Sequence, residues 1–397
     1  MMPEIYLDNN ATTHLSDSVR AALRDAIEQD LGNPSSAHRS GEKARREIVS
    51  ARDSVAALVG ASPEHLIFGS GATELNYWVL THAIRQSTHP HLVTTEVEHS
   101  CVLETAALLE ATGVRVTRLP VGRDGRINIE QLLRTIEHGT SLVSIQWVNN
   151  ETGVIQPVDE IGEICSAKGV QFHCDAAQAC GKIEIDFSES GIDYLTLSAH
   201  KMHGPSGIGG LCVKNRNALT PLLRGGSQEH GLRPGTENLL GIIGFGAAAR
   251  DRTSSLEEAC DFTTRLRDRF EALVLEAIPH VVINGTTKYR VCNSTNLMFP
   301  GLDGAAMVAL LDRAGVRCSQ SSACTSSRPE PSYVLRAMGL SEEEAFASVR
   351  FSFSNQNTMA EAEAAAAKVI SVFERLSCFE GRQTAFEKLH GAVNHEV

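Results

Sequence analysis

Residues 170–201 contain the two strand-like runs that decide the fold, and they read VQFHCDAAQACGKIEIDFSESGIDYLTLSAHK. The first run, residues 170–174, leads into Asp175, and the second, residues 194–197, leads to Lys201. Short apolar runs of this kind are typical of strands buried on both faces, as in a parallel sheet. Parallel sheets bind ligands beyond the carboxyl ends of their strands, so Asp175 and Lys201 are candidates for one shared site.

The alternation of short apolar runs with helix-like segments extends from about residue 63 to residue 214. This pattern predicts an α/β fold with a mostly parallel sheet covered by helices. Further along, a long charged helix predicted over residues 255–277, short strands and a helix-rich C-terminus indicate a second, smaller α+β domain. We therefore expect a large domain over residues 14–255 and a small domain made of residues 1–13 and 256–397.

The composition is that of a globular protein with an excess of acidic residues. The chain has 397 residues, which at roughly 150 residues per domain favours two domains. Hydrophobic residues make up 42% and charged residues 21%, so the chain is not of the disordered class. The net charge of −12 argues against a nucleic acid or an anionic membrane as partner. No signal peptide or membrane-spanning run is apparent, so we expect a cytoplasmic location.

The ten cysteines include no pair spaced C-x-x-C, so the sequence predicts no zinc ribbon and no resident metal site. Without a secretion signal, the thiols are expected to be reduced and mostly buried. Cys324 differs from the others because it lies among the small and polar residues 319–327. Such a composition is typical of an exposed, mobile loop, where a thiol is accessible.

Other polar groups follow strand-like runs, and each has a structural alternative. Residues 70–74, Ser-Gly-Ala-Thr-Glu, suit a single phosphate at a helix N-terminus, but they also suit an ordinary helix cap. Asp175 suits a metal, a sugar hydroxyl or a protonated ring nitrogen, and equally an N-cap. His99 suits stacking on a cofactor ring with proton transfer, whereas a lone histidine is more often structural. Asn149 and Asn150 would ordinarily form a turn.

Lys201 gives these candidates a shared chemical interpretation. A lysine in a partly desolvated cleft has a lowered pKa and forms imines with carbonyl compounds. Pyridoxal phosphate chemistry needs such a lysine, a carboxylate on the pyridinium nitrogen and a phosphate cup. Lys201, Asp175 and residues 70–74 are the right residue types for these three parts, and all of them follow strands of the same predicted sheet.

Short motifs spread along the chain carry a family resemblance. They are YLDNNATT (6–13), GNPSS (32–36), SGATE (70–74), VEH (97–99), VNNETG (148–153), HCDAAQ (173–178), SAHK (198–201), RPGTEN (233–238), SACTS (322–326) and SVRFS (348–352). In content and order they resemble the cysteine desulfurases of the NifS and IscS type, within the class-V aminotransferase group of fold-type I pyridoxal phosphate enzymes. Residues 221–226 look closer to the NifS branch.

The resemblance implies a fold-type I architecture with a seven-stranded sheet, the cofactor pyridoxal 5′-phosphate, and a homodimer. Lys201 would hold the cofactor covalently, Asp175 would pair with its ring nitrogen, and His99 would stack on the ring. Arg350, in the small domain, would bind the substrate carboxylate beside Asn150. The remaining cofactor contacts would come from Ala72, Thr73, Asn150, Gln178, Ser198 and His200, with Thr236 supplied by the other subunit.

The resemblance also implies a reaction. L-Cysteine would give L-alanine, and its sulfur would pass to Cys324 as a persulfide. An iron–sulfur scaffold or another acceptor protein would receive it, in a housekeeping or a nitrogen-fixation role. Cys324 would suit a transient iron–sulfur cluster as well. Three alternatives stay open: an aminotransferase would keep Lys201 without needing Cys324, a selenocysteine lyase shares the scaffold, and an inactive assembly scaffold would need neither.

The chain departs from the family pattern near the reactive cysteine. Ser321 stands where glycine is usual, three residues before Cys324. A side chain there costs up to about 1 kcal/mol if the backbone needs a positive φ, so loop mobility or partner choice would change rather than the chemistry. Leu75 and Asn76 also replace the usual residues after Thr-Glu, without a consequence that the sequence reveals.

Overall fold

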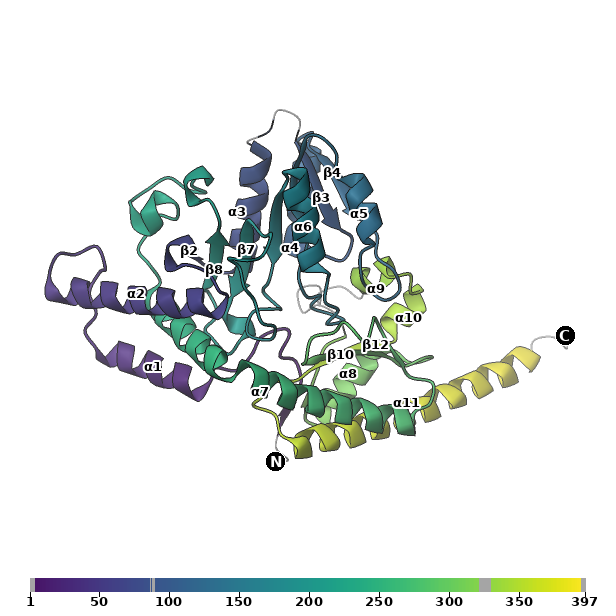
Figure 1. The fold of residues 1–397 in the computed structure, drawn as a ribbon. Helices are drawn as coiled ribbons and strands as arrows, with labels where there is room; N and C mark the ends of the chain where they lie inside the picture. Colours follow the sequence, from purple (N-terminus) through teal and green to yellow (C-terminus); the bar gives the residue numbers. More distant parts are fainter. Residues whose placement is uncertain (1–3, 86, 88–89, 321–329, 394–397) are drawn as a thin grey trace.

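The computed structural model describes residues 4–85, 87, 90–320 and 330–393. A large sheet with helices on both faces forms one part of the molecule, and a smaller mixed part lies beside it (Figure 1). Within the described residues no helix is both long enough and apolar enough to cross a bilayer.

The large sheet has seven strands in the described residues, in the order β2-β8-β7-β6-β5-β3-β4. The strands are β2 (Leu66–Gly69), β3 (His91–Thr95), β4 (Arg115–Leu119), β5 (Thr140–Ser144), β6 (Gln171–Asp175), β7 (Tyr194–Ser198) and β8 (Gly209–Val213). Strand β8 runs antiparallel to both of its neighbours, and the other pairings are parallel. The predicted mostly parallel α/β sheet is confirmed.

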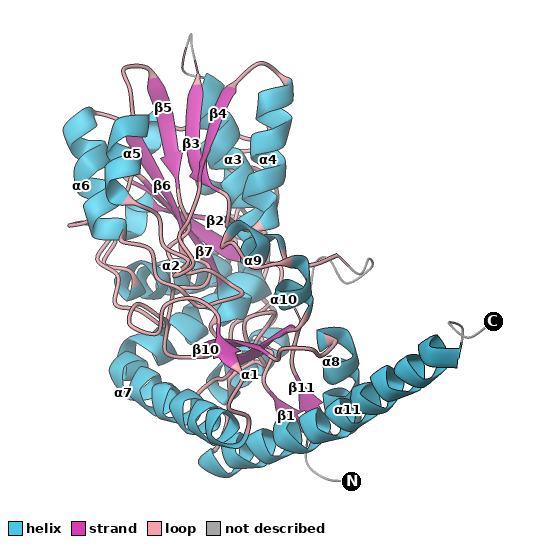
Figure 2. Ribbon diagram, turned by 90° about the vertical axis from the view of Figure 1, so that its right-hand side faces the viewer, coloured by secondary structure: helices cyan, strands magenta, loops and turns pink. Residues whose placement is uncertain are grey.

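Helices cover both faces of this sheet (Figure 2). Those of this part are α1 (Asp17–Glu28), α2 (Arg39–Leu58), α3 (Ala72–Arg85), α4 (Ser100–Ala111), α5 (Ile129–Thr135) and α6 (Val158–Lys168). Successive strand residues point to opposite faces, so Ile67 belongs to the cluster that contains Trp78 of α3, whereas Phe68 belongs to the cluster on the other face, which also contains Ile161 of α6. Both faces are apolar because both are covered, which explains the continuous apolar runs in the sequence.

Helix α7 (Leu239–Ala277) connects the two parts along the bottom of the molecule in Figure 1. It is longer than the predicted helix, which began at residue 255. The helix therefore runs without interruption through the boundary expected there, and the division into domains stays a prediction. Phe245 packs in the core beneath the large sheet, and Phe270 packs in the core of the smaller part, so one helix contributes to both cores.

In the part of the chain that the structure describes, the smaller part contains two short sheets. Strand β1 pairs with β11, and the second sheet has the order β12-β10-β9. Its elements are β1 (Ile5–Tyr6), β9 (Val282–Ile283), β10 (Ser294–Met298), α8 (Gly304–Arg313), β11 (Val316–Arg317), α9 (Tyr333–Ala337), α10 (Glu342–Phe346), β12 (Ser348–Ser352) and α11 (Met359–Val393). Leu7 packs in the same core as Phe351 of β12, so the first described residues belong to this part.

Candidate active site

A pocket of about 230 Å³ lies beyond the carboxyl ends of the parallel strands. Residues that follow β3, β5, β6 and β7, and the first turn of α3, line one side of it, and Arg350 of β12 lines the other. The structure thereby brings together most of the residues that were expected to share a site. They are Ala72, Thr73, His99, Asn150, Asp175, Gln178, Ser198, His200, Lys201 and Arg350.

Two expected residues are not among those that line the pocket. Cys324 and the neighbouring Ser321 lie outside the described residues. Thr236 is exposed, and its neighbours Gly235 and Glu237 line a different hollow with Ser70. Because Thr236 was expected to act on the other subunit of a dimer, its role stays a prediction.

Lys201 ends a short 3-10 helix, Ala199–Lys201, that follows β7 directly. Its Nζ donates hydrogen bonds to the backbone oxygens of Asn10, at 2.6 Å, and Ala11, at 2.8 Å. These two residues belong to the N-terminal motif, far away in sequence, and both line the pocket. These two backbone acceptors hold the lysine amine at the pocket wall.

Asp175, the last residue of β6, is buried and held by two donors. The backbone N–H of Ala177 donates to Oδ1 at 2.9 Å, and Asn76 Nδ2 donates to Oδ2 at 2.7 Å. The first contact closes a turn over residues 175–177, whereas the structural alternative expected for Asp175 was the N-cap of a helix, and the described chain continues here as a turn. The second gives Asn76 a role that the sequence did not reveal, because it comes from α3 and fixes the outer carboxylate oxygen.

His99 is the N-cap of α4, and this contact determines which ring nitrogen carries the proton. The backbone N–H of Cys101 donates to His99 Nδ1 at 3.2 Å. Burial lowers the pKa of His99, so the neutral ring is favoured. A neutral imidazole whose Nδ1 accepts a hydrogen bond carries its proton on Nε2. The Cys101 thiol also lies 3.1 Å from Nδ1.

The end of the pocket near α3 has the features of an anion site. The first N–H groups of a helix lack intrahelical partners and attract negative charge, and Ala72 and Thr73 are the first two residues of α3. A close approach of two backbones shapes this end, because a Cβ on Gly209 would lie 2.9 Å from Gly71 Cα. Burial lowers the pKa of His200 to about 4, so this ring is neutral and offers one N–H.

Arg350 lies in β12 with only 1% of its surface exposed. Its Nη2 donates to Asp8 Oδ1 at 2.6 Å, and Nη1 donates to the backbone oxygen of Asn150 at 3.1 Å. Among the described residues, the buried Nε of Arg350 and the buried Oδ1 of Asn150 have no hydrogen-bond partner. Unpaired buried polar atoms are costly, so these two atoms indicate the place of a missing polar ligand.

Glu98 is a buried carboxyl that sequence reasoning did not single out. Thr95 Oγ1 donates to its Oε1 at 2.7 Å, and the backbone N–H of Gln146 donates to its Oε2 at 2.9 Å. Burial raises the pKa of Glu98 to about 8, with a contribution from the Asp175 charge. The only signal in the sequence was its place beside His99.

Similarity to known proteins agrees with this geometry. The aminotransferase class-V family pattern matches residues 5–364. The chain belongs to the class-V aminotransferase family. It is 38% identical over 359 residues to cysteine desulfurase NifS of Azotobacter vinelandii, which covers 90% of this chain and 89% of that protein. It is 41% identical over 377 residues to cysteine desulfurase IscS of Rickettsia akari, covering 94% and 92%.

A solved structure titled "SspA in complex with cysteine" superimposes with a TM-score of 0.78 at 34% identity, covering 88% of this chain and 99% of that one. The fold is therefore the fold-type I architecture that the motifs predicted. Relatives named NifS and IscS match at similar identity, so the assignment to the NifS branch stays a prediction.

Enzymes of this family use pyridoxal 5′-phosphate, and the residues of the pocket fit that group. The phosphate suits the start of α3, and the buried carboxylate of Asp175 suits a protonated ring nitrogen. The amine of Lys201 suits the aldehyde, since it lies on the same pocket wall. In the described part of the chain, no cluster of three or more His, Cys, Asp or Glu side chains could hold a metal ion.

Proposed function

We propose that this chain is a pyridoxal phosphate-dependent cysteine desulfurase that transfers the sulfur of L-cysteine to Cys324. The observation that carries the proposal is the pocket itself. It combines an amine at Lys201, a buried carboxylate at Asp175, a helix N-terminus for a phosphate, and a buried arginine with an unpaired N–H. Relatives at about 40% identity that are named cysteine desulfurase support the same substrate.

Arg350 would bind the carboxylate of the amino acid. A guanidinium matches a carboxylate through two parallel hydrogen bonds, and the Asp8 carboxylate already orients the guanidinium from behind. The unpaired Nε is the donor that a substrate carboxylate would satisfy. Asn150, whose backbone oxygen contacts Arg350, also presents its unpaired Oδ1 at this end of the pocket.

Lys201 and His99 would carry out the proton transfers of the reaction. When bound, the protonated pyridine ring of the cofactor withdraws the electron pair that remains after the Cα–H bond of the substrate breaks. The Nζ amine of Lys201, once it is free, would remove the Cα proton. His99 would hold a proton on Nε2, because Cys101 occupies Nδ1, and would donate it to the bound substrate.

Sulfur transfer then requires a nucleophile. The Cys324 thiolate attacks the sulfur of the bound cysteine, a new S–S bond forms and the Cβ–S bond breaks. The electron pair of that bond stays on carbon, which takes up protons to give L-alanine. One L-cysteine and one enzyme thiol thus become one L-alanine and one enzyme persulfide, and no external oxidant is needed. The sequence motif around Cys324 carries this assignment, since the residue lies outside the described part.

Partners follow from the same proposal. The persulfide would be handed to an iron–sulfur scaffold or another sulfur-acceptor protein, in a reducing compartment such as the cytoplasm. All described cysteines are free thiols, which suits that compartment. A homodimer would bring Thr236 of one subunit to the pocket of the other.

The test is to incubate the cofactor-loaded enzyme with L-cysteine and to measure L-alanine, sulfide and protein-bound persulfide together with the visible spectrum. Cys324→Ala should abolish all three products and keep the absorbance of the bound cofactor. Cys378→Ala, which removes an exposed thiol outside the pocket, should leave turnover unchanged.

The alternatives predict other outcomes. Full alanine formation by Cys324→Ala would contradict the proposal, and amino transfer to a 2-oxo acid would then indicate an aminotransferase. Turnover of L-selenocysteine with none of L-cysteine would indicate a selenocysteine lyase.

A further inference from the structure

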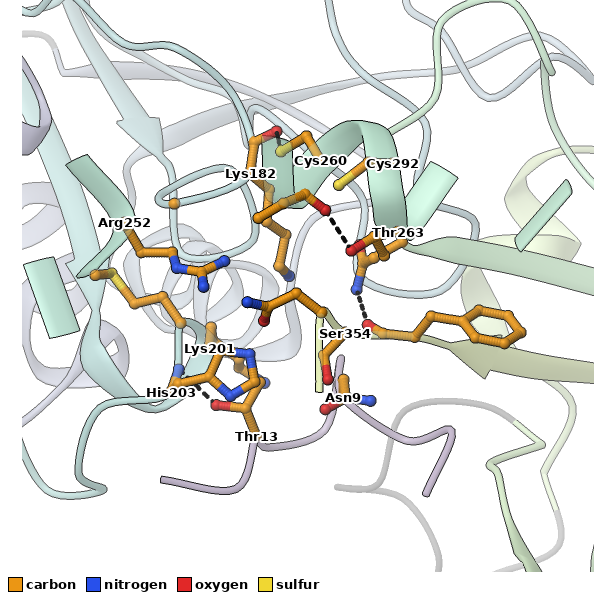
Figure 3. Close-up of a pocket in the computed structure, with 16 residues that line it drawn as sticks. Asn9, Thr13, Lys182, Lys201, His203, Arg252, Cys260, Thr263, Cys292 and Ser354 are labelled. Carbon is orange, nitrogen blue, oxygen red and sulfur yellow. Dashed lines mark hydrogen bonds between the residues drawn. The ribbon is translucent and has the colours of Figure 1, made fainter. Parts of the chain in front are cut away.

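A second, smaller cavity of about 30 Å³ lies behind Lys201, where α7 meets the turn after β6 and the segment before β10 (Figure 3). Lys201 lines this cavity as well as the larger pocket. Two cysteines line it too: Cys260 from α7, and Cys292 from the segment that precedes β10. Neither thiol has a role in the proposed desulfurase reaction.

The two thiols contact each other. The Cys292 S–H donates a hydrogen bond to the sulfur of Cys260, and Figure 3 shows both sulfur atoms at the same wall of the cavity. The Cys260 S–H donates in turn to the backbone oxygen of Lys182 at 3.2 Å. Both residues are free cysteines of intermediate burial, unlike the buried Cys165, Cys174 and Cys180, and both line the cavity.

Basic groups surround the pair, and no carboxylate lines this cavity within the described residues. Arg252 of α7 is buried there, and its Nε has no hydrogen-bond partner in the described chain. The ammonium of Lys182 donates to Gln178 Oε1 at 2.9 Å, which is a neutral partner. Burial lowers the pKa of Lys182 to about 8.

This environment makes the two thiols unequal. The hydrogen bond from Cys292 lowers the pKa of the Cys260 thiol, and the charges of Arg252 and Lys182 act in the same direction, while burial and Asp261 oppose them. The pKa of Cys292 is raised, because its proton is held in the bond to Cys260 and because it is buried. A thiol with a lowered pKa, placed beside cations and a second thiol, is the arrangement of a redox-sensitive cysteine pair.

We propose that Cys260 and Cys292 form an oxidative modification site, in which a small peroxide converts the two thiols into an intramolecular disulfide. The Cys260 thiolate attacks the O–O bond of hydrogen peroxide and becomes a sulfenic acid, and the oxygen that leaves takes a proton to form water. Cys292 then attacks this sulfur, an S–S bond forms and a second water leaves. Two thiols and one peroxide thus give one disulfide and two waters.

The volume of the cavity limits the size of the oxidant that can reach the two thiols. Its volume of about 30 Å³ holds at most about two or three water-sized molecules, since one water needs at least about 10–15 Å³. Hydrogen peroxide fits this space, whereas a glutathione-sized disulfide does not. The product would join α7 to the segment before β10. It would lie beside Lys182, whose ammonium contacts Gln178 of the cofactor pocket.

The test uses cofactor-loaded enzyme carrying Cys324→Ser, so that the proposed sulfur-accepting thiol does not react. The protein is treated with a small excess of hydrogen peroxide and then digested without reductant. We expect the loss of two thiols and two hydrogens per chain, a cross-linked peptide that contains Cys260 and Cys292, and reversal by dithiothreitol. Cys292→Ser should instead form a dimedone adduct on Cys260.

Two further variants keep the test decisive. Cys378→Ser is the matched control that removes an unrelated exposed thiol, and it should form the same cross-link. Arg252→Gln should slow the oxidation of Cys260 at neutral pH, about tenfold for each unit by which the thiol pKa rises. Retained cofactor absorbance shows that each variant is folded. Oxidation of Cys378 while Cys260 and Cys292 stay reduced would overturn the proposal, as would a cross-link between other cysteines.

Discussion

Glu98 offers a pH-dependent prediction because its carboxyl is buried beside the active site. Its pKa is raised by burial from 4.5 to about 8, and its two oxygens accept hydrogen bonds from Thr95 and Gln146. We predict that Glu98→Gln becomes progressively more stable than the wild type as the pH rises from 5 to 8. Glutamine has nearly the same shape, and its amide can keep the bond from Gln146 while donating to the Thr95 hydroxyl.

The sign follows from proton linkage. Between the two pKa values the unfolded chain has lost the Glu98 proton and the folded chain keeps it, so stability falls as the pH rises. The stabilising effect of the protonated carboxyl is complete below pH 4.5 and is lost as the pH passes through about 8. Each unit of pKa difference corresponds to about 1.4 kcal/mol, so the full effect is about 5 kcal/mol.

The assay is urea unfolding of the wild type and of Glu98→Gln, followed by circular dichroism at several pH values between 5 and 8.5. Titration of all other groups cancels in the difference between the two proteins. The difference should grow by up to about 1.4 kcal/mol per pH unit and level off above pH 8. A difference that stays constant across this range would refute the assignment of a protonated Glu98 in the folded state.

Three other changes test the contacts of the pocket. Lys201→Arg should eliminate the visible absorbance of the covalently held cofactor, and an unchanged spectrum would mean that another lysine holds it. Arg350→Lys should lower kcat/KM for L-cysteine by about 10- to 150-fold, because the substrate carboxylate loses about 1.5–3 kcal/mol of charge-assisted hydrogen bonding. Steady-state kinetics measure this change. An unchanged kcat/KM would mean that the substrate carboxylate binds elsewhere. Asn76→Leu should reduce the free energy of unfolding by about 1–3 kcal/mol, since Asp175 Oδ2 loses its donor. Denaturant unfolding checks this last change, and an unaltered midpoint would show that the contact contributes nothing.

Much of the large sheet was predictable because its strands are buried on both faces. Such strands must be apolar along their whole length, so they stand out between the helical segments that cover them. Element ends were less predictable. Helix α7 begins at Leu239 rather than near residue 255, because its first turns are rich in glycine and alanine and pack against the core of the large part instead of displaying charge.

The residues of the candidate site likewise fall into those that the sequence identified and those that it did not. Lys201, Asp175 and His99 were identifiable because each follows a strand, and strand ends of a parallel sheet meet at one edge. The sequence did not identify Asn76, Glu98 or the Cys260–Cys292 pair as part of a site, because no local pattern distinguishes them from other residues of the same types.

Local patterns thus sufficed for the fold class, for the order of its elements and for the polar residues at the strand ends, since these follow from hydrophobic periodicity along the chain. Contacts between distant segments needed the folded molecule. Asp8 meets Arg350, and Cys260 meets Cys292, only after the crossovers of the chain have been packed. Burial likewise sets the pKa of Glu98, because the protein atoms that exclude water from this carboxyl come from several elements at once.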